Sequence, residues 1–190
     1  MKNPQKRLIT GKIATITILL KRFSTENDVT GITLLPETAG RISQLGSLEE
    51  IMMICEEIPC VQPCLDVAHY HACTQGSLRC QDDFESLLDT VEHRLGVDRL
   101  SACHFHMYPI EWGAKGEIRH RAFSDITEMK QISLFQQDSD CGYLPRYEPF
   151  LRVLHRRQLS PIIICEAKQS QDIGAKAMKL YWQILERQER

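Results

Sequence analysis

VQPCLD, residues 61–66, is the stretch that decides the fold, because an apolar run ends there in a single carboxylate, Asp66. Three other apolar runs along the chain are also followed by an acidic or histidine side chain. Short apolar runs that alternate with longer amphipathic stretches predict strands that alternate with helices. The polar residues that follow the four runs are Glu37 after GITLLP, Asp66 after VQPCL, His104 after LSAC and Glu166 after IIIC.

The stretches between the runs predict helices. Ser47, followed three residues later by Glu50, forms a capping box that starts a helix at Leu48. Residues 82–96 place apolar side chains on one helical face and end at Gly96. Further helices are expected over 5–22, 147–157 and 173–185, and strands over 31–36, 61–65, 100–107 and 161–165. The loop that runs from the third strand to about residue 142 exceeds the usual connection length, which indicates a functional loop.

Strand followed by helix, four times over, predicts parallel α/β architecture. Parallel strands bring their carboxyl ends to one edge, where ligands bind both in open doubly wound sheets and in closed barrels. The alternation by itself leaves both architectures open. In either of them, the four polar residues at the strand ends are expected to lie close together.

The composition is that of an ordinary globular protein, with 190 residues, 43% hydrophobic residues and 25% charged residues. A net charge of −2 argues against a strongly cationic nucleic-acid platform. No apolar run approaches the length of a membrane span or a signal peptide, so we expect no membrane association and a cytoplasmic location. A local basic cluster is interpreted as a solvated helix face, with phosphate contact as the alternative, and consists of Arg152, His155, Arg156 and Arg157.

The eight cysteines match neither a secreted disulfide scaffold nor a paired Cys-x-x-Cys zinc site. Cys55, Cys103 and Cys165 lie within apolar patterns. We therefore expect reduced thiols, most of them in or near the core.

Carboxylates and imidazoles at strand ends point to a divalent metal. Glu37 in PETAGRISQLG suits a metal bridge or a general base, and a loop acid paired with Arg41 is the alternative. Asp66 and His69 have the D-x-x-H spacing that offers an oxygen and a nitrogen to zinc or manganese. The alternative is a structural Asp turn with a surface histidine. His71 is interpreted as a bystander or an outer partner of a ligand.

The remaining candidates follow the third and fourth runs. His104 and His106 share one face of the strand, and only one of them is expected to reach its end. Glu117 and His120 lie on the loop beyond. Glu166 adjoins a buried-looking strand, where a carboxylate is costly unless it binds a metal or pairs, for example with Lys168. Any one histidine is more often structural, but four similar sites at four strand ends favour a metal centre.

These motifs resemble those of a known family. PETAGRISQLGSLEE, CLDVAHYHA, the His104 segment and IIICEA resemble, in order and spacing, the carboxyl-terminal half of the endonuclease IV family, which has a xylose-isomerase-like TIM barrel. IEWGAKGE is similar to a segment of the archaeal branch of that family. The resemblance covers roughly residues 10 to 182. It implies a zinc-dependent hydrolase with a three-metal cluster that acts in DNA repair and cuts DNA at abasic sites.

The resemblance also implies roles for individual residues. Glu37 would bridge two metals, Asp66, His104 and Glu166 would complete the shell of one, and His69 and His120 would hold a third. Glu37 and Glu166 are the candidate catalytic residues, and zinc is the expected ion, with manganese as the alternative. Two departures matter. The family has an Asp two residues before the equivalent of His120, where this chain has Ile118, and the acid of this chain lies one residue earlier at Glu117. The family also takes two further histidine ligands from the amino-terminal half of the barrel, which we do not expect this chain to contain.

Counting strands leads to an expectation about assembly. A barrel of this type has eight strands in about 250 residues, and four are readable here. Four open strands leave two unpaired edges. We therefore expect residues 1–190 to form a single domain that is a partial TIM barrel: a truncated product, or a half that a homodimer or another partner completes.

The leading hypothesis is a metal-dependent hydrolase of DNA with abasic sites, for which Lys115, Arg119 and Arg121 are candidate phosphate contacts. The second is a sugar or sugar phosphate isomerase or epimerase of the same superfamily, which would use a single metal. Ile110, where epimerase relatives tend to carry arginine, and the additional His120 favour the nuclease. The third is a non-catalytic remnant that binds a metal structurally or not at all.

Overall fold

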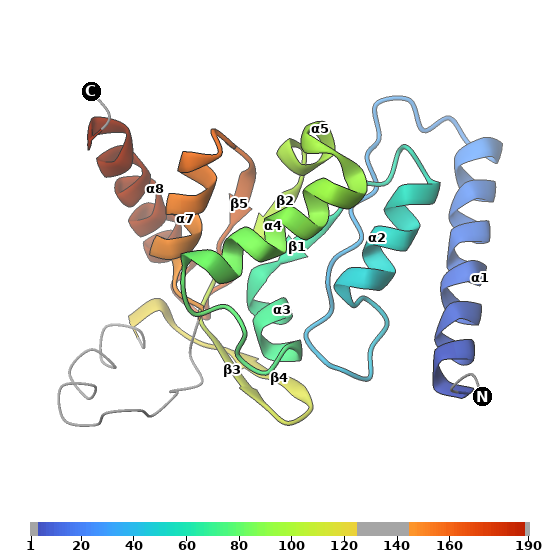
Figure 1. The fold of residues 1–190 in the computed structure, drawn as a ribbon, viewed down its shortest axis with the longest axis horizontal. Coiled ribbons are helices and arrows are strands. Elements are labelled where there is room, and N and C mark those ends of the chain that lie inside the picture. Colours follow the sequence, from blue (N-terminus) through green and yellow to red (C-terminus); the bar gives the residue numbers. More distant parts are fainter. Residues whose placement is uncertain (1–3, 125–144, 189–190) are drawn as a thin grey trace.

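The computed structural model describes residues 4–124 and 145–188, and the last part of the long loop expected up to about 142 therefore lies outside the described residues. Figure 1 shows the helices in chain order across the molecule, in front of the central strands. The helices are α1 (Pro4–Glu26), α2 (Leu48–Glu57), α3 (Val67–Cys73), α4 (Gln81–Leu95), α5 (Val97–Ser101), α7 (Tyr147–Arg156) and α8 (Gln171–Gln188). The strands are β1 (Cys64–Asp66), β2 (His104–His106), β3 (Ile110–Gly113), β4 (Gly116–His120) and β5 (Ile162–Ile164).

The central sheet is parallel, with strand order β1-β2-β5. Its register aligns Asp66, His106 and Ile164 across the three strands. The segment before α2, expected as a strand over 31–36, is reduced to parallel bridges at Leu34 and Glu37. Pro36 has no N–H group to donate, which limits the regular ladder there. The predicted α/β architecture with a parallel sheet is confirmed.

The core lies between the outward face of the sheet and the helices that cover it. Phe105 of β2 packs against Phe150 of α7 with ring centroids 5.2 Å apart, and Phe150 packs against Phe84 of α4 at 5.5 Å. All three side chains are fully buried. Because side chains alternate along a strand, burying Phe105 on this face directs His104 and His106 to the other face.

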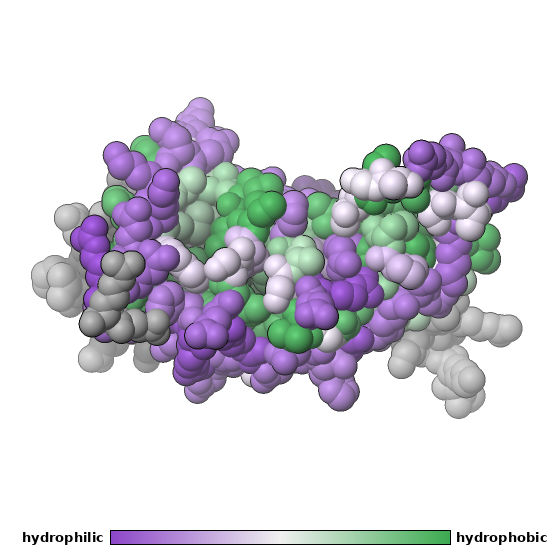
Figure 2. All heavy atoms as spheres, turned by 90° about the horizontal axis from the view of Figure 1, so that it is seen from above, coloured by the Kyte–Doolittle hydropathy of each residue, from purple (hydrophilic) through white to green (hydrophobic). Residues whose placement is uncertain are grey.

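The inner face of the sheet is hollowed. Figure 2 shows a concavity along one long side of the molecule, with hydrophobic residues exposed in it. On β5, Ile162 is 57% exposed and Ile164 is 42% exposed, while Ile163 between them is partly buried. β5 was expected to be buried on both faces, but within residues 4–124 and 145–188 the helices cover only its outer face.

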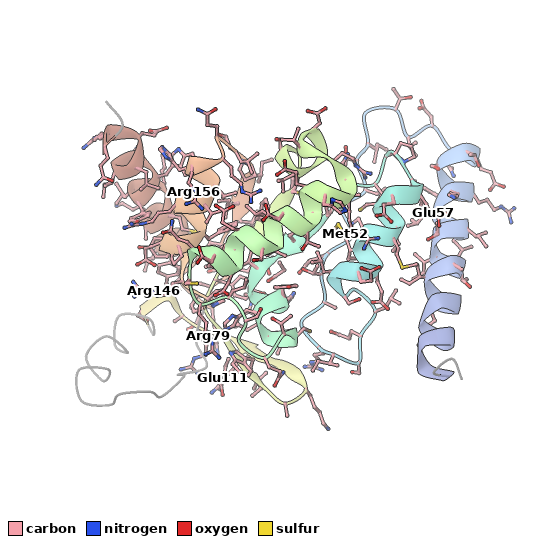
Figure 3. All side chains as sticks on the ribbon, in the orientation of Figure 1. Met52, Glu57, Arg79, Glu111, Arg146 and Arg156 are labelled. Atoms are coloured by element: carbon pink, nitrogen blue, oxygen red, sulfur yellow. The ribbon has the colours of Figure 1, made fainter. Side chains whose placement is uncertain are left out.

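Ion pairs join neighbouring helices. Arg156, labelled in Figure 3, and Arg157 extend from α7 to Glu85 on α4, and Arg157 also pairs with Glu92 at 3.0 Å. Two residues of the basic cluster expected to be a solvated helix face, Arg156 and Arg157, therefore bind acids of the adjacent helix, whereas Arg152 donates to the Tyr181 hydroxyl on α8. Glu57, also labelled, lies on the side of α2 that faces α1 and accepts a hydrogen bond from Lys21 at 2.6 Å.

The capping box at Ser47 and the helix end at Gly96 are confirmed. Three elements were not predicted: α3 directly after Asp66, α5, and the antiparallel hairpin β3–β4 within the long loop. The seven described cysteines are free thiols, as expected, and Cys55, Cys103 and Cys165 are buried. Among the described helices, none combines the length and apolar character needed to cross a bilayer.

Candidate metal centre

Four segments bring polar side chains to the carboxyl end of the parallel sheet. Asp66 and His106 are the last residues of β1 and β2, Glu166 follows β5 by two residues, and Glu37 forms a bridge beside β1. Oxygen and nitrogen atoms of these side chains approach within 4.8 Å of one another in overlapping groups. The predicted convergence of Glu37, Asp66 and Glu166 therefore takes place.

His106 occupies the centre of this first group. Its Nδ1 lies 3.5 Å from Asp66 Oδ2, 3.5 Å from Glu166 Oε1 and 3.6 Å from Glu37 Oε1. His104, which the sequence placed in the shell, begins β2 and lies two residues farther from the strand end. Two residues span about 6.6 Å of strand, so His104 is too far down the sheet to join the carboxylates.

Asp66 is the most buried acid of the site, with no exposed surface. Its Oδ1 caps α3 by accepting a hydrogen bond from the His69 N–H at 2.7 Å, and its Oδ2 accepts one from the Tyr108 hydroxyl at 2.7 Å. The Thr38 hydroxyl accepts from the Asp66 N–H at 2.9 Å and holds its backbone. These contacts fix the Oδ2 atom that faces His106.

A second group adjoins the first and consists of His69, Glu117 and His120. Both imidazoles direct Nε2 at the Glu117 carboxylate, at 3.4 Å in each case. Their Nδ1 atoms lie 3.0 Å from the Thr38 carbonyl for His69 and 2.9 Å from the Glu166 carbonyl for His120, so each Nδ1–H donates to backbone. This arrangement leaves both Nε2 lone pairs directed at one point, as metal-binding histidines require.

A β-bulge explains how Glu117 and His120 come to share a face. In a regular strand, residues three apart point to opposite faces. In β4, Glu117 pairs with Trp112 and Arg119 pairs with Glu111, so Ile118 is an extra residue. Ile118 is 54% exposed and points away from the site. The bulge therefore directs the acid at position 117 into the site, although the resemblance noted in the sequence led us to expect an acid one position later.

The hairpin that carries Glu117 is docked by close backbone contacts. The Glu117 N–H donates to the Gly40 carbonyl at 2.7 Å, and the Ile42 N–H donates to the Lys115 carbonyl at 3.2 Å. A Cβ on Gly40 would lie 2.5 Å from His69 Cδ2 and 2.6 Å from Glu117 Oε2. A Cβ on Gly116 would lie 2.3 Å from the Gly40 oxygen. Glycine is thus required at both positions for the second group to form.

The carboxylates and imidazoles shift one another's titration. The proximity of Asp66, followed by that of Cys64 and Glu37, raises the pKa of His106 to about 12. Burial alone would lower the pKa of His69, but its hydrogen bond to Glu37 and the nearby charge of Asp66 raise it to about 9. The two histidines, His106 first, lower the pKa of Glu37 well below its usual range. The site therefore attracts positive charge strongly.

The first group fits a metal ion. His106 Nδ1 is buried and has no hydrogen-bond partner, although three carboxylate oxygens surround it at 3.5 to 3.6 Å. Ligands held 2.0–2.2 Å from one tetrahedral zinc ion lie roughly 3.3–3.6 Å apart. These spacings are too long for good hydrogen bonds and match the edges of such a shell. The second group, with 3.4 Å spacings, fits by the same criterion.

The site opens onto solvent. A pocket of about 490 Å³ lies in front of it, between the loop that follows Glu37 and the hairpin residue Glu117. The pocket is lined by Glu37, Thr38, Ala39, Gly40, Gln44, Leu45, His69 and Glu117. A ligand could therefore reach both groups from one side.

Besides His104, four of the candidate residues lie outside both groups. His71 is buried, accepts a hydrogen bond from the Leu78 N–H at 3.1 Å on its Nδ1, and meets Trp112 edge-on, so it supports the loop after α3. Lys115 lies in the turn of the hairpin. Arg119 and Arg121 both pair with Glu111, at 2.6 and 3.4 Å, and Glu111 is labelled on the hairpin in Figure 3.

Sequence reasoning missed Tyr108 and Thr38. Tyr108 holds Asp66 through its hydroxyl and stacks on His120 with ring centroids 4.2 Å apart. Its position two residues after His106 was a usable signal, because alternation places both on one face of an extended chain. Thr38 contributes a hydroxyl and a carbonyl, and nothing in its local sequence indicates either contact.

Comparison with known proteins gives two findings. The sequence pattern of a family described as xylose isomerase-like TIM barrel matches residues 14–184. An uncharacterized protein of Methanocaldococcus jannaschii is 29% identical over 150 residues, which make up 79% of this chain and 48% of that protein. The chain thus spans about half the length of the curated relative that it matches.

Proposed function

The chain belongs to the family of xylose isomerase-like TIM barrels, and on that basis we propose that it is a divalent-metal-dependent hydrolase of the endonuclease IV type, which cleaves DNA phosphodiesters at abasic sites. The observation that carries this proposal is the pair of adjacent ligand groups. One consists of His106 and the three carboxylates around it, Glu37, Asp66 and Glu166, and the other of His69, Glu117 and His120.

Adjacent groups of this kind suit phosphodiester hydrolysis. His69 joins them, because its Nδ1 lies 3.1 Å from Glu37 Oε1 while its Nε2 faces Glu117. Sites that hold two ions close together are common in nucleases and phosphatases, where they stabilise both the attacking and the leaving oxygen. A sugar isomerase of the same superfamily needs the first group alone. The second group therefore favours the hydrolase.

Zinc is the proposed ion, with manganese as the alternative. Imidazole and carboxylate ligands in a mixed set suit both ions, and the donor spacing matches the short bonds of zinc. Bound at these positions, such ions would polarise a phosphoryl oxygen and lower the pKa of a water molecule.

The side chains of this chain would orient the reactants around those ions. The Tyr108 hydroxyl donates to the Asp66 carboxylate and holds it in place. The backbone carbonyls of Thr38 and Glu166 fix the rings of His69 and His120, respectively. The side chains of Glu37 and Glu166 are 39% and 36% exposed, far more than Asp66. Glu37 lines the open pocket, and Glu166 is exposed to a similar degree, so each could accept a proton from an attacking water.

DNA contact would involve the hairpin. Lys115 at its turn is the simplest candidate for a phosphate contact. Arg119 and Arg121 would have to exchange their pairing with Glu111 for phosphate. Such contacts would make affinity depend on salt, because neutralised phosphates release counterions.

We also propose that the four parallel segments form one half of a barrel. Three strands and the bridged segment at Leu34 and Glu37 support this, together with the exposed inner face of β5. A complete barrel of this kind has eight strands. The other half would come from elsewhere in a longer chain, from a second copy or from another partner.

The single-metal alternative has one specific observation in its favour. The first group is by itself a complete set of three carboxylates and one imidazole, which suffices for a sugar isomerase or epimerase. Ile110, where epimerase relatives tend to carry arginine, is fully buried and offers no polar group to a sugar.

Incubation with a DNA duplex that contains one abasic site, with and without a chelator, tests the proposal. Incision that stops on chelation and returns with zinc supports the hydrolase. Bound zinc without incision, accompanied by turnover of a ketose or aldose, would support the isomerase instead. Bound zinc without either activity would support a structural role.

Metal content gives an independent test of the first group. Glu37→Ala and Glu166→Ala are each expected to lower the zinc bound per chain, because each removes a charged oxygen ligand. Glu111→Ala is the matched control, since Glu111 pairs with Arg119 on the hairpin. Unchanged metal content in both site variants would refute the assignment.

A further inference from the structure

Cys64 lies against the imidazole nitrogen of His106 that the proposed metal shell does not use. Strand β1 presents Cys64 and Asp66 on the same face, and the ring of His106 lies along that face. Its Nδ1 meets the Asp66 carboxylate, and its Nε2 lies 3.4 Å from Cys64 Sγ. The ring is therefore held at both ends by residues two apart on the neighbouring strand.

The other two histidines show the same arrangement with a different partner. In His69 and His120 the nitrogen that does not face Glu117 donates to a backbone carbonyl, that of Thr38 and that of Glu166. In His69 this nitrogen also faces Glu37 and Asp66, at 3.1 and 3.2 Å. In His106 the sulfur of Cys64 takes the place of the carbonyl. All three imidazoles thus have one nitrogen held and the other directed at carboxylates.

The hydrogen bond made by one ring nitrogen of a histidine determines whether the other ring nitrogen can bind a metal. A neutral imidazole carries its single proton on one nitrogen and binds a metal through the other. A partner that accepts a hydrogen bond from Nε2 keeps the proton there and leaves the Nδ1 lone pair free. Such partners of metal-binding histidines typically change metal affinity 10–100-fold when they are removed.

We propose that Cys64 is a positioning residue for the metal site, which accepts the Nε2–H of His106 and thereby directs Nδ1 at the ion. This inference rests on the proposed function, since it assumes that the first group binds a metal. Cys64 is only 5% exposed, so water does not readily replace the sulfur. Sγ of Cys64 also lies within 4.8 Å of ligand atoms of Glu37 and His106, so direct ligation by the thiol is the competing role. We favour the positioning role because Sγ faces Nε2 of His106, whereas the three carboxylates face Nδ1.

The test compares three variants in zinc-binding experiments. Cys64→Ala removes the acceptor, and Cys64→Ser replaces it with a hydroxyl that can accept the same proton. Cys55→Ala is the matched control, because it deletes another fully buried sulfur on α2. We expect zinc affinity, measured by competition with a chelator, to fall about 10-fold or more in Cys64→Ala. It should recover largely in Cys64→Ser and stay unchanged in Cys55→Ala.

A second readout reports the proton itself. Nitrogen-15 NMR of the histidine rings in the zinc-loaded protein should show His106 protonated at Nε2 in the wild type and in Cys64→Ser. Ultraviolet–visible spectra of the protein with cobalt in place of zinc should show no sulfur-to-cobalt charge-transfer absorption, since the thiol is not a ligand. A charge-transfer band that disappears in Cys64→Ala would overturn the positioning role in favour of direct ligation.

Other outcomes separate this inference from the proposed function. Equal zinc affinity in wild type and Cys64→Ala would overturn the role of Cys64 alone, as would a Cys64→Ser variant that is as weak as Cys64→Ala. Loss of affinity in Cys55→Ala as well would show general destabilisation and also count against it. Normal zinc binding with the expected tautomer, but no incision of abasic DNA, would refute the hydrolase and leave Cys64 in place. A wild-type protein that binds no zinc would refute both.

Discussion

The choice between two histidines in the sequence HFH determines the ligand set at the scale of single residues. His106 ends β2 among three carboxylates, whereas His104 begins the same strand. The sequence predicted a strand from residue 100 onward, which made His104 the first polar residue after LSAC. The structure has α5 at Val97–Ser101, so the strand starts later and ends two residues beyond the expected ligand. Side-chain alternation and an end of the strand near residue 107 were predicted, but the late start of the strand was not.

His106→Ala is expected to reduce zinc affinity by more than about 100-fold, because it removes a nitrogen that contacts the ion directly. His104→Ala should leave affinity unchanged. Both affinities can be measured by chelator competition on variants whose circular dichroism matches the wild type. The reverse ranking would restore His104 to the shell and contradict the observed register.

The raised pKa of His69 predicts how the metal-free protein responds to alkali. The pKa is about 9 in the folded state, against 6.5 for an ordinary histidine. A group whose pKa rises on folding stabilises the folded state fully below the unfolded pKa and loses that contribution as the pH rises through the folded pKa. The free energy of unfolding in the presence of chelator should therefore fall by up to about 3 kcal/mol between pH 6.5 and pH 10.

The control for this pH dependence is His69→Gln, which cannot carry the charge and should show a flatter profile over the same range. Denaturant titrations at fixed pH values would measure both curves. A wild-type profile that stays level, or that rises with pH, would contradict the protonated state assigned to His69.

At the scale of secondary structure, local signals predicted some elements and missed others. The capping box at Ser47 and the apolar spacing before Gly96 located α2 and α4, because both signals depend on neighbouring residues alone. The hairpin β3–β4 also had a local signal, in the alternation of IEW and EIR around Gly113 and Gly116. Its docking onto the Gly40 segment depends on contacts between distant residues, which the sequence pattern does not encode.

Gly116→Ala tests this docking. Gly116 has a φ of +92°, and an added Cβ would meet the Gly40 oxygen at 2.3 Å. We expect a loss of about 1–3 kcal/mol of stability and displacement of Glu117 from His69 and His120. Thermal unfolding and zinc stoichiometry would measure the two effects.

Gly113→Ala is the matched control in the same hairpin. Its added Cβ would lie 3.3 Å from Ile118 Cδ1, an exposed side-chain end that can move. It should retain nearly all stability and zinc binding. Equal effects of the two substitutions would show that the contact between Gly40 and Gly116 does not position the second group.

At the scale of the whole molecule, the alternation of strands and helices predicted the parallel sheet and the edge where ligands gather. It did not predict how exposed the inner face of β5 would be. The three consecutive isoleucines indicated burial on both faces, because apolar runs without alternation are typical of covered strands. In the structure the side chains of Ile162 and Ile164 are exposed instead.

Exposed isoleucines on an uncovered strand face are expected to bind hydrophobic dyes and to promote association. Ile162→Lys should lower dye fluorescence and the apparent mass at high concentration, which sedimentation would measure. The stability should change by less than about 0.5 kcal/mol, since the side chain is 57% exposed. Ile173→Lys on α8, at 59% exposure, is the control. If both variants behaved alike, general surface hydrophobicity would explain the association.

The extra residue at Ile118 bears on how distant sequences should be compared. Where one strand of a pair contains an extra, bulged residue, a functional side chain can lie one position earlier or later in the sequence and still occupy the same point in space. Two proteins could then share a chemically equivalent centre although no gap-free alignment superimposes their acids. Searches that demand a fixed interval between Glu117 and His120 would overlook such equivalents, whereas searches by spatial arrangement would find them.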